Sequence, residues 1–151
     1  MSVSTAVREQ AWCLVVPHHA RGAGLARRRL AHDLGGLVSA ELLSDTVTVV
    51  AELVGNAVRH AAPLPGDVIR VAWRLRTGSG DVAVEVRVTD GGADQAPMPR
   101  QVGPEAVDGR GLAIIDALAQ RWGVIRDGLG QCVWAELYRP LLGPALPVPS
   151  D

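Results

Sequence analysis

Residues 52–60 read Glu-Leu-Val-Gly-Asn-Ala-Val-Arg-His and combine apolar residues with regularly spaced polar ones. This stretch lies in a run over about 39–62 whose apolar residues recur at helical spacing. Glu52, Asn56 and His60 are spaced four residues apart, and each such step turns a helix by only about 40°. The three side chains therefore share one polar edge, beside an apolar face wide enough to pack on a sheet.

Asn56 is the residue of this edge that most needs a reason, because it is the only asparagine in the chain. Asparagine is a poor residue inside a helix, since its side chain competes for backbone hydrogen bonds. A solvated polar stripe is the simpler interpretation of a Glu/His pair. The amide oxygen of Asn56, however, suits Mg²⁺ bound to phosphates, and Glu52 could deprotonate a nucleophile that attacks phosphorus.

Alternating apolar and polar residues in 69–75 and 82–88 predict two strands joined by a tight turn. Adjacent strands joined in this way favour a two-layer α/β sandwich, with a mixed, mainly antiparallel sheet and helices on one face. The other predicted elements are a strand over 11–16, a helix over about 19–34, a helix over 111–121, and strands over 122–126 and 132–138.

The second predicted strand of this pair ends at Asp90-Gly91-Gly92. An aspartate followed by glycines is often a simple turn. The functional alternative is a carboxylate at the floor of an apolar pocket, where it would accept a hydrogen bond from the exocyclic amine of adenine. Gly92 would then let a flat base approach the backbone closely.

Residues 91–110 contain three prolines and show no periodicity. A loop of about twenty residues without structure is uncommon in a compact domain, and it is usually a functional lid or disordered. Gly109-Arg110-Gly111-Leu112 then opens a helix, where free backbone N–H groups favour anions. As a dinucleotide-binding fingerprint this stretch fails, because no strand precedes it and a third glycine is missing.

The 151 residues indicate one domain, which we expect over 11–139 with flexible termini at 1–10 and 140–151. A net charge of −1 argues against direct binding of nucleic acid. No segment approaches the roughly 18 consecutive apolar residues of a membrane-spanning helix, and no signal peptide is recognisable, so we expect a cytoplasmic protein. All 15 basic residues are arginine, which excludes a Walker phosphate loop with its lysine.

In chain order, ELVGNAVRH (52–60), VTDGG (88–92) and GRGLAII (109–115) resemble the three motifs of a known nucleotide-binding domain. This is the GHKL-type domain, or Bergerat fold, which DNA gyrase, heat-shock chaperones, mismatch-repair ATPases and sensor histidine kinases share. Within that superfamily the chain is most similar to the stand-alone anti-sigma-factor serine/threonine kinases. The resemblance extends from about Ala11 to Tyr138 and implies that the long loop is an ATP lid.

The resemblance also implies ATP and Mg²⁺ as ligands and a role for each matching residue. Asn56 would hold Mg²⁺, and Glu52 would be the general base toward a target serine. The nucleotide-binding set would consist of Asp90 and Gly92 at the adenine, Gly109, Gly111 and Leu112 where the last helix opens, and Arg100 and Arg110, which only charge and position place near the phosphates.

The last strand departs from the pattern of these kinases. It typically starts with Gly-Lys-Thr, whose hydroxyl supports the adenine-binding aspartate, but this chain has Gly130-Gln131-Cys132. Cys132 would take the place of that threonine in the nucleotide site, and its thiol is only a weak donor. We therefore expect weaker recognition of adenine, but no change of fold.

Two functions remain open at this point. The first is an anti-sigma factor that phosphorylates a small anti-anti-sigma (STAS-type) partner and thereby regulates transcription, which Glu52 favours. The second is an ATP-gated binding module that engages a sigma factor or another regulatory partner without phosphoryl transfer, which Cys132 favours. The resemblance also suggests a homodimer, whereas neither a nucleic acid nor a membrane is an expected partner.

Overall fold

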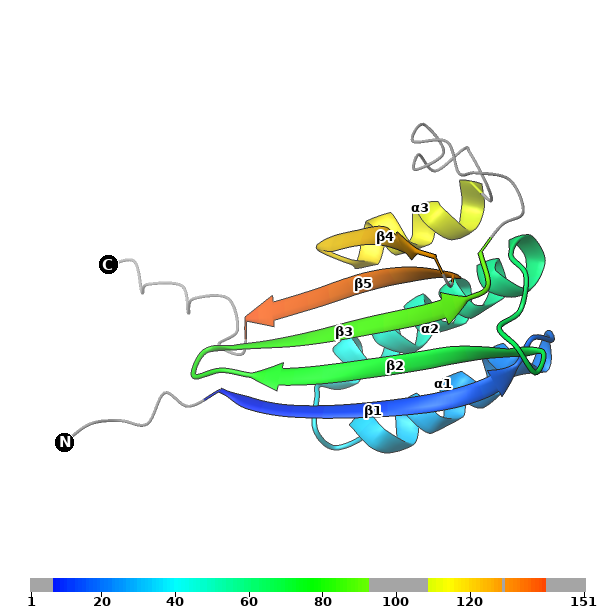
Figure 1. Ribbon diagram of the computed structural model, residues 1–151. Coiled ribbons are helices and arrows are strands. Elements are labelled where there is room, and N and C mark those ends of the chain that lie inside the picture. Colours follow the sequence, from blue (N-terminus) through cyan, green and yellow to red (C-terminus); the bar gives the residue numbers. More distant parts are fainter. Residues whose placement is uncertain (1–6, 93–108, 129, 141–151) are drawn as a thin grey trace, which may run out of the picture.

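The computed structural model describes residues 7–92, 109–128 and 130–140, which form one layer of helices against one sheet (Figure 1). Elements follow in the order β1 (Arg8–Pro17), α1 (Arg21–Leu34), α2 (Ala40–His60), β2 (Val68–Thr77), β3 (Asp81–Asp90), α3 (Gly109–Leu118), β4 (Arg121–Asp127) and β5 (Gly130–Pro140).

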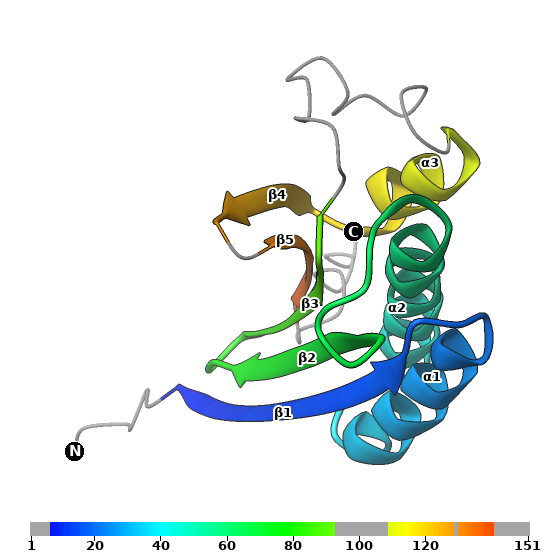
Figure 2. The ribbon, with the colours of Figure 1, turned by 45° about the vertical axis from the view of Figure 1, so that its right-hand side comes forward.

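The five strands of this described part form a single sheet in the order β1-β2-β3-β5-β4. Each neighbouring pair is antiparallel. Figure 2 shows the helices α1, α2 and α3 on one face of the sheet, and no element of the described part lies on the other face. The predicted two-layer sandwich is confirmed, and its sheet is antiparallel throughout the described strands rather than mixed.

Alternation along the strands explains why the helices pack on one particular face of the sheet. In β3 every second residue is buried, from Val82 to Asp90, and the residues between them are partly exposed. Successive side chains of a strand point to opposite faces, so this pattern gives one apolar face for the helices. The face of β2 beneath the helices carries Ile69, Val71, Trp73 and Leu75, each no more than 2% exposed.

The long helix α2 has 21 residues and covers the middle of the sheet. Ser39 is its N-cap, and the Ser39 side chain accepts a hydrogen bond from the backbone N–H of Leu42 at 3.1 Å. The helix buries its apolar stripe against the sheet, including Val50, Leu53 and Val54. This packing leaves the edge with Glu52 and Asn56 only partly buried.

Element boundaries differ from the sequence predictions by a few residues. β1 begins at Arg8, three positions early, because its ten residues pair in full with β2. α3 ends at Leu118, since the N–H of Gln120 already bonds to the carbonyl of Glu136 in β5. The predicted flexible ends overlap the described residues at 7–10 and at 140. Residues 8–10 belong to β1 and residue 140 to β5, while 1–6 and 141–151 lie outside the described part.

Most of the predicted ATP lid, residues 93–108, also lies outside the described part of the chain. Within the described part, no helix is long and apolar enough to cross a membrane.

Candidate functional site

A cavity lies where α2, α3, β4 and β5 surround the end of β3. Its walls are largely apolar and include Leu112, Trp122 and Val133. The indole Nε1 of Trp122 donates to Asp116 Oδ1 at 3.1 Å, which fixes this wall to α3. Polar side chains reach the same cavity from four elements: Asn56 and His60 from α2, Asp90 from β3, Arg126 from β4 and Gln131 from β5. Asn56 and Asp90, both predicted as site residues, therefore line the same cavity, although they lie on different elements that are distant in the sequence.

Asp90 is the buried acid of this cavity, with only 1% of its surface exposed. Its Oδ1 accepts a hydrogen bond from the backbone N–H of Gly92 at 2.7 Å. Burial raises the pKa of the Asp90 carboxyl above its ordinary value, and the hydrogen bonds from Gly92 and Gln131 and the charge of Arg126 oppose that rise. A largely desolvated carboxylate in an apolar cavity is a strong acceptor for a ligand N–H group.

The segment after Asp90 is tied to the residues that follow α2. The N–H of Gly91 donates to the carbonyl of Ala62 at 2.7 Å, and the N–H of Ala62 donates to the carbonyl of Gly92 at 2.9 Å. Gly92 has φ of 83°, a conformation that glycine adopts without steric cost. A side chain at Gly91 would collide with the carbonyl of Pro63. Both glycines are therefore needed to hold the carboxylate in fixed register with α2.

His18 contributes to this geometry and was not predicted. Its Nε2 lies 2.8 Å from the carbonyl oxygen of Ala61 and 3.2 Å from that of Ala57. Both partners only accept hydrogen bonds, so Nε2 carries a proton and donates to the last turn of α2. No periodicity or motif marks this histidine in the sequence, because its role depends on where β1 ends relative to a helix about forty residues later.

Asn56 and His60 line the cavity from α2, as the shared helix edge predicts. Asn56 Oδ1 accepts a hydrogen bond from Arg59 Nη2 at 2.9 Å. Glu52, one turn earlier, is partly buried and is not among the residues lining the cavity.

The described residues contain no group of three His, Cys, Asp or Glu side chains that could hold a metal ion. The oxygen donors of the cavity instead fit an Mg²⁺ ion that enters bound to phosphates. Such an ion commonly takes only one or two oxygen ligands from the protein. Asn56 is the residue that would supply such an oxygen.

Gln131 and Arg126 are site residues that sequence reasoning missed. Gln131 pairs with Asp90 across β3 and β5 and lines the cavity. Cys132, predicted to support Asp90, pairs instead with Thr89 and is not among the lining residues. Neighbouring residues of a strand face opposite sides, so Cys132 lies on the face of the sheet opposite the helices. The structure therefore does not bring Cys132 to the site, and an amide occupies the place predicted for a thiol.

The glycine-rich stretch forms the beginning of α3. The helix starts at Gly109, so residues 109–111 supply its first turn, and Leu112, 7% exposed, lines the cavity. The first N–H groups of a helix have no intrahelical partner and favour anions. The role of Gly109, Arg110 and Gly111 at the phosphates stays a prediction. Arg100 lies outside the described residues.

Residues 16–137 match the family model described as the histidine kinase-like ATPase domain. A search of curated proteins finds no match to the chain. The matched range contains the whole cavity, from the end of β1 to β5, and the family implies ATP binding, usually with Mg²⁺. This chain belongs to the histidine kinase-like ATPase domain family.

Proposed function

We propose that the protein is an ATP-dependent serine/threonine kinase of the cytoplasm that acts as an anti-sigma factor. Its substrate would be a serine of a small anti-anti-sigma partner of the STAS type, and phosphorylation of that partner would leave the kinase free to hold a sigma factor. The protein would thereby regulate transcription. A homodimer is part of the same proposal, by resemblance to the anti-sigma kinases.

The observation that carries the ATP-binding part is the buried Asp90 carboxylate in a cavity with apolar walls. A planar base fits such walls, and the carboxylate would accept a hydrogen bond from the 6-amino group of adenine. Asn56 faces the same cavity from α2. The base and the metal-bound phosphates would therefore be held by two elements whose relative position the Gly91 and Ala62 hydrogen bonds fix.

Glu52 would act in the transfer itself. The serine hydroxyl would attack the γ-phosphorus, its proton would pass to the Glu52 carboxylate, and the bond to the β,γ-bridging oxygen would break to release ADP. Bound Mg²⁺ would neutralise charge on the phosphates. Glu52 lies on the same helix edge as Asn56, one turn away, so α2 would align the base with the phosphates.

The test is transfer of label from γ-³²P-ATP to a STAS-type protein from the same organism. Wild type should label the partner in the presence of Mg²⁺. Glu52→Gln should lower the labelling rate by about 100-fold or more, the usual contribution of a general base, while ATP affinity stays unchanged. Asn56→Ala should weaken ATP binding when Mg²⁺ is present.

Glu41→Gln is the matched control, because Glu41 is exposed in the first turn of α2, at the other end of the helix. It should label the partner like wild type. Equal labelling by Glu52→Gln and wild type would remove Glu52 from the mechanism. Wild type that binds ATP and the partner but transfers no label would overturn the kinase proposal.

One observation favours the second candidate, an ATP-gated binding module that transfers nothing. Glu52 is absent from the cavity lining, although it is the only base proposed for the transfer. This candidate predicts that partner affinity changes between ATP and ADP while no label appears. Calorimetric titration of the partner in each nucleotide, alongside the labelling assay, separates the two functions.

A further inference from the structure

Three polar side chains form a row across neighbouring strands at the floor of the cavity. Asp90 of β3 pairs with Gln131 of β5, and Gln131 pairs with Arg126 of β4. All three line the cavity. Arg126 Nε donates to Gln131 Oε1 at 3.2 Å, and Gln131 Nε2 lies 3.5 Å from each carboxylate oxygen of Asp90.

The chemistry of its two neighbours fixes the orientation of the Gln131 amide. A guanidinium group only donates hydrogen bonds, so it selects the amide oxygen, and an ionised carboxylate only accepts, so it selects the amide nitrogen. Each Nε2 contact with Asp90 is at the outer limit of hydrogen-bond length. The NH₂ group of Gln131 is thus held beside the carboxylate with donor capacity left for a ligand.

We propose that Gln131 is a second residue that reads the base, by donating from Nε2 to N1 of adenine beside the Asp90 contact with the 6-amino group. Arg126 is the positioning residue that keeps the amide in the required orientation. This inference rests on the proposed ATP binding and goes beyond it, because it names the determinant of base specificity.

An acceptor next to a donor matches the edge of adenine, which presents a donor at the 6-amino group and an acceptor at N1. Hypoxanthine presents the reverse pair, an acceptor at O6 and a donor at N1. In the same pose, the Asp90 carboxylate would face the acceptor O6 of hypoxanthine, and the NH₂ group of Gln131 would face its N1–H donor. Buried polar groups without partners are costly, so the pair discriminates against ITP by both contacts.

The decisive ligand is 1-deaza-ATP, which keeps the 6-amino group and replaces N1 by C–H. Wild type should bind it about three- to tenfold more weakly than ATP, the usual size of one hydrogen bond. In Gln131→Leu the two nucleotides should bind equally. The comparison of two nucleotides on two proteins is a double-mutant cycle in which one change is made in the ligand. It separates the contact between Gln131 and N1 from general damage to the cavity, which would weaken both nucleotides equally.

Two further variants test the orientation of the amide. Gln131→Glu replaces the donor by an acceptor, so 1-deaza-ATP should bind at least as well as ATP. Arg126→Met releases the amide oxygen, so the preference for ATP over both 1-deaza-ATP and ITP should shrink, whereas a purely structural role would weaken all three nucleotides in proportion. Gln10→Leu is the matched control, because Gln10 is exposed on β1, and it should keep the wild-type preference.

Binding is measured by calorimetry, and thermal unfolding shows that each variant is folded. If wild type binds ATP and 1-deaza-ATP equally, or if Gln131→Leu keeps the wild-type ratio, the inference is wrong while ATP binding stands. If wild type binds neither nucleotide, the proposed function itself fails.

Discussion

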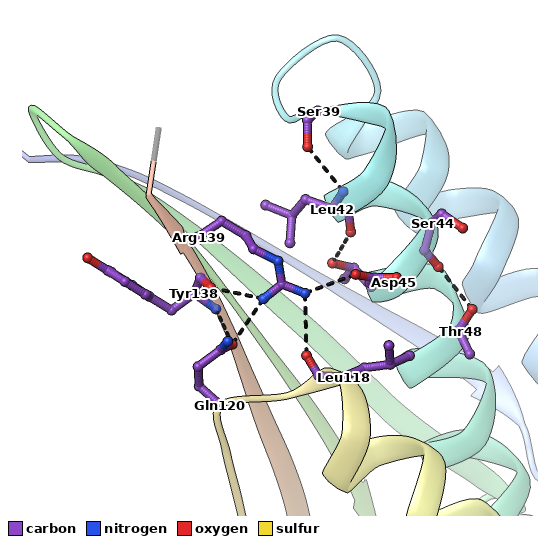
Figure 3. Close-up of polar contacts among 10 residues, drawn as sticks. Ser39, Leu42, Ser44, Asp45, Thr48, Leu118, Gln120, Tyr138 and Arg139 are labelled. Atoms are coloured by element: carbon purple, nitrogen blue, oxygen red, sulfur yellow. Dashed lines mark hydrogen bonds and ion pairs between the residues drawn. The ribbon is translucent and has the colours of Figure 1, made fainter. Parts of the chain in front are cut away.

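The two ends of α2 carry polar clusters of opposite character. At its N-terminal end Arg139 of β5 donates to Asp45 at 2.9 Å, to Gln120 at 3.1 Å and to the carbonyls of Tyr138 and Leu118 at 2.9 and 3.5 Å (Figure 3). At the other end the Asp90 carboxylate has one short hydrogen bond, from Gly92 at 2.7 Å, and two contacts of 3.5 Å with Gln131.

The difference separates a structural cluster from a binding site. Arg139 joins α2, the end of α3 and β5, and both of its Nη atoms donate hydrogen bonds to protein oxygens. Asp90 is more deeply buried yet less completely bonded, and burial raises the pKa of its carboxyl. A buried polar group that is short of partners is costly unless a ligand supplies them. The contrast predicts that variants at the two ends affect different properties.

The largest effect is expected on ATP affinity at Asp90. In Asp90→Asn the remaining oxygen is needed by the N–H of Gly92, so the new NH₂ group would face the 6-amino group of adenine, donor against donor. ATP affinity should fall about 10- to 100-fold, as for the loss of a hydrogen bond to a charged group. Calorimetry measures it, and an unchanged affinity would remove Asp90 from base recognition.

Arg139→Met should act on stability. Losing the ion pair with Asp45 and the bonds to Gln120 and two carbonyls should lower the free energy of unfolding by about 2 kcal/mol, since the guanidinium is only partly exposed. Urea unfolding measures the change. Arg74→Met, at an exposed position of β2, is the matched control and should change little.

The same Arg139→Met protein should keep wild-type ATP affinity below its unfolding transition. A loss of affinity comparable to that of Asp90→Asn would show that the two ends of α2 are coupled, and the comparison would fail.

Sequence patterns predicted the elements well because each is encoded locally. Alternation in β2 and β3 and the apolar stripe of α2 reflect burial on one face, which a window of a few residues reveals. Asn56 could be singled out for the same reason, since an isolated asparagine inside a helix conflicts with local propensity.

The floor of the cavity could not be predicted in this way, because it depends on register between distant strands. Asp90 meets Gln131 only through the β3–β5 pairing, across 41 positions of sequence. A shift of one residue moves every side chain of a strand to the other face. The resemblance to the anti-sigma kinases assigned Cys132 to the site, whereas the register of β5 brings its neighbour Gln131 to the cavity.

A smaller effect concerns pH and tests the cost of burying Asp90. Because the pKa of Asp90 is raised in the folded state, its ionisation lowers the free energy of unfolding as pH rises from the ordinary aspartate range through the raised pKa. Asp90→Asn should therefore be more stable than wild type at neutral pH, and the difference should vanish in acid. Chemical unfolding at several pH values measures it.

Binding of adenosine should show the opposite dependence, since the base needs the ionised carboxylate. Affinity should fall as pH is lowered through the raised pKa of Asp90, at higher pH than for an ordinary aspartate. His18 and His60 also lie near the site, but they are present in Asp90→Asn as well, so the comparison with this variant isolates Asp90. Adenosine carries no phosphate, which removes the titration of the phosphate groups from the comparison.

The smallest effect is expected at the N-cap of α2. Ser39→Ala removes the hydrogen bond to the N–H of Leu42 and should lower the free energy of unfolding by about 1 kcal/mol, as at other N-caps. Ser44→Ala, at an exposed position inside the same helix, should be neutral or slightly stabilising, because alanine is the better helix former. Urea unfolding of both variants measures the pair. Because the cap lies at the Arg139 end, ATP affinity of the folded protein should stay unchanged, and a change would mean that fraying at Ser39 reaches Asn56 through the helix.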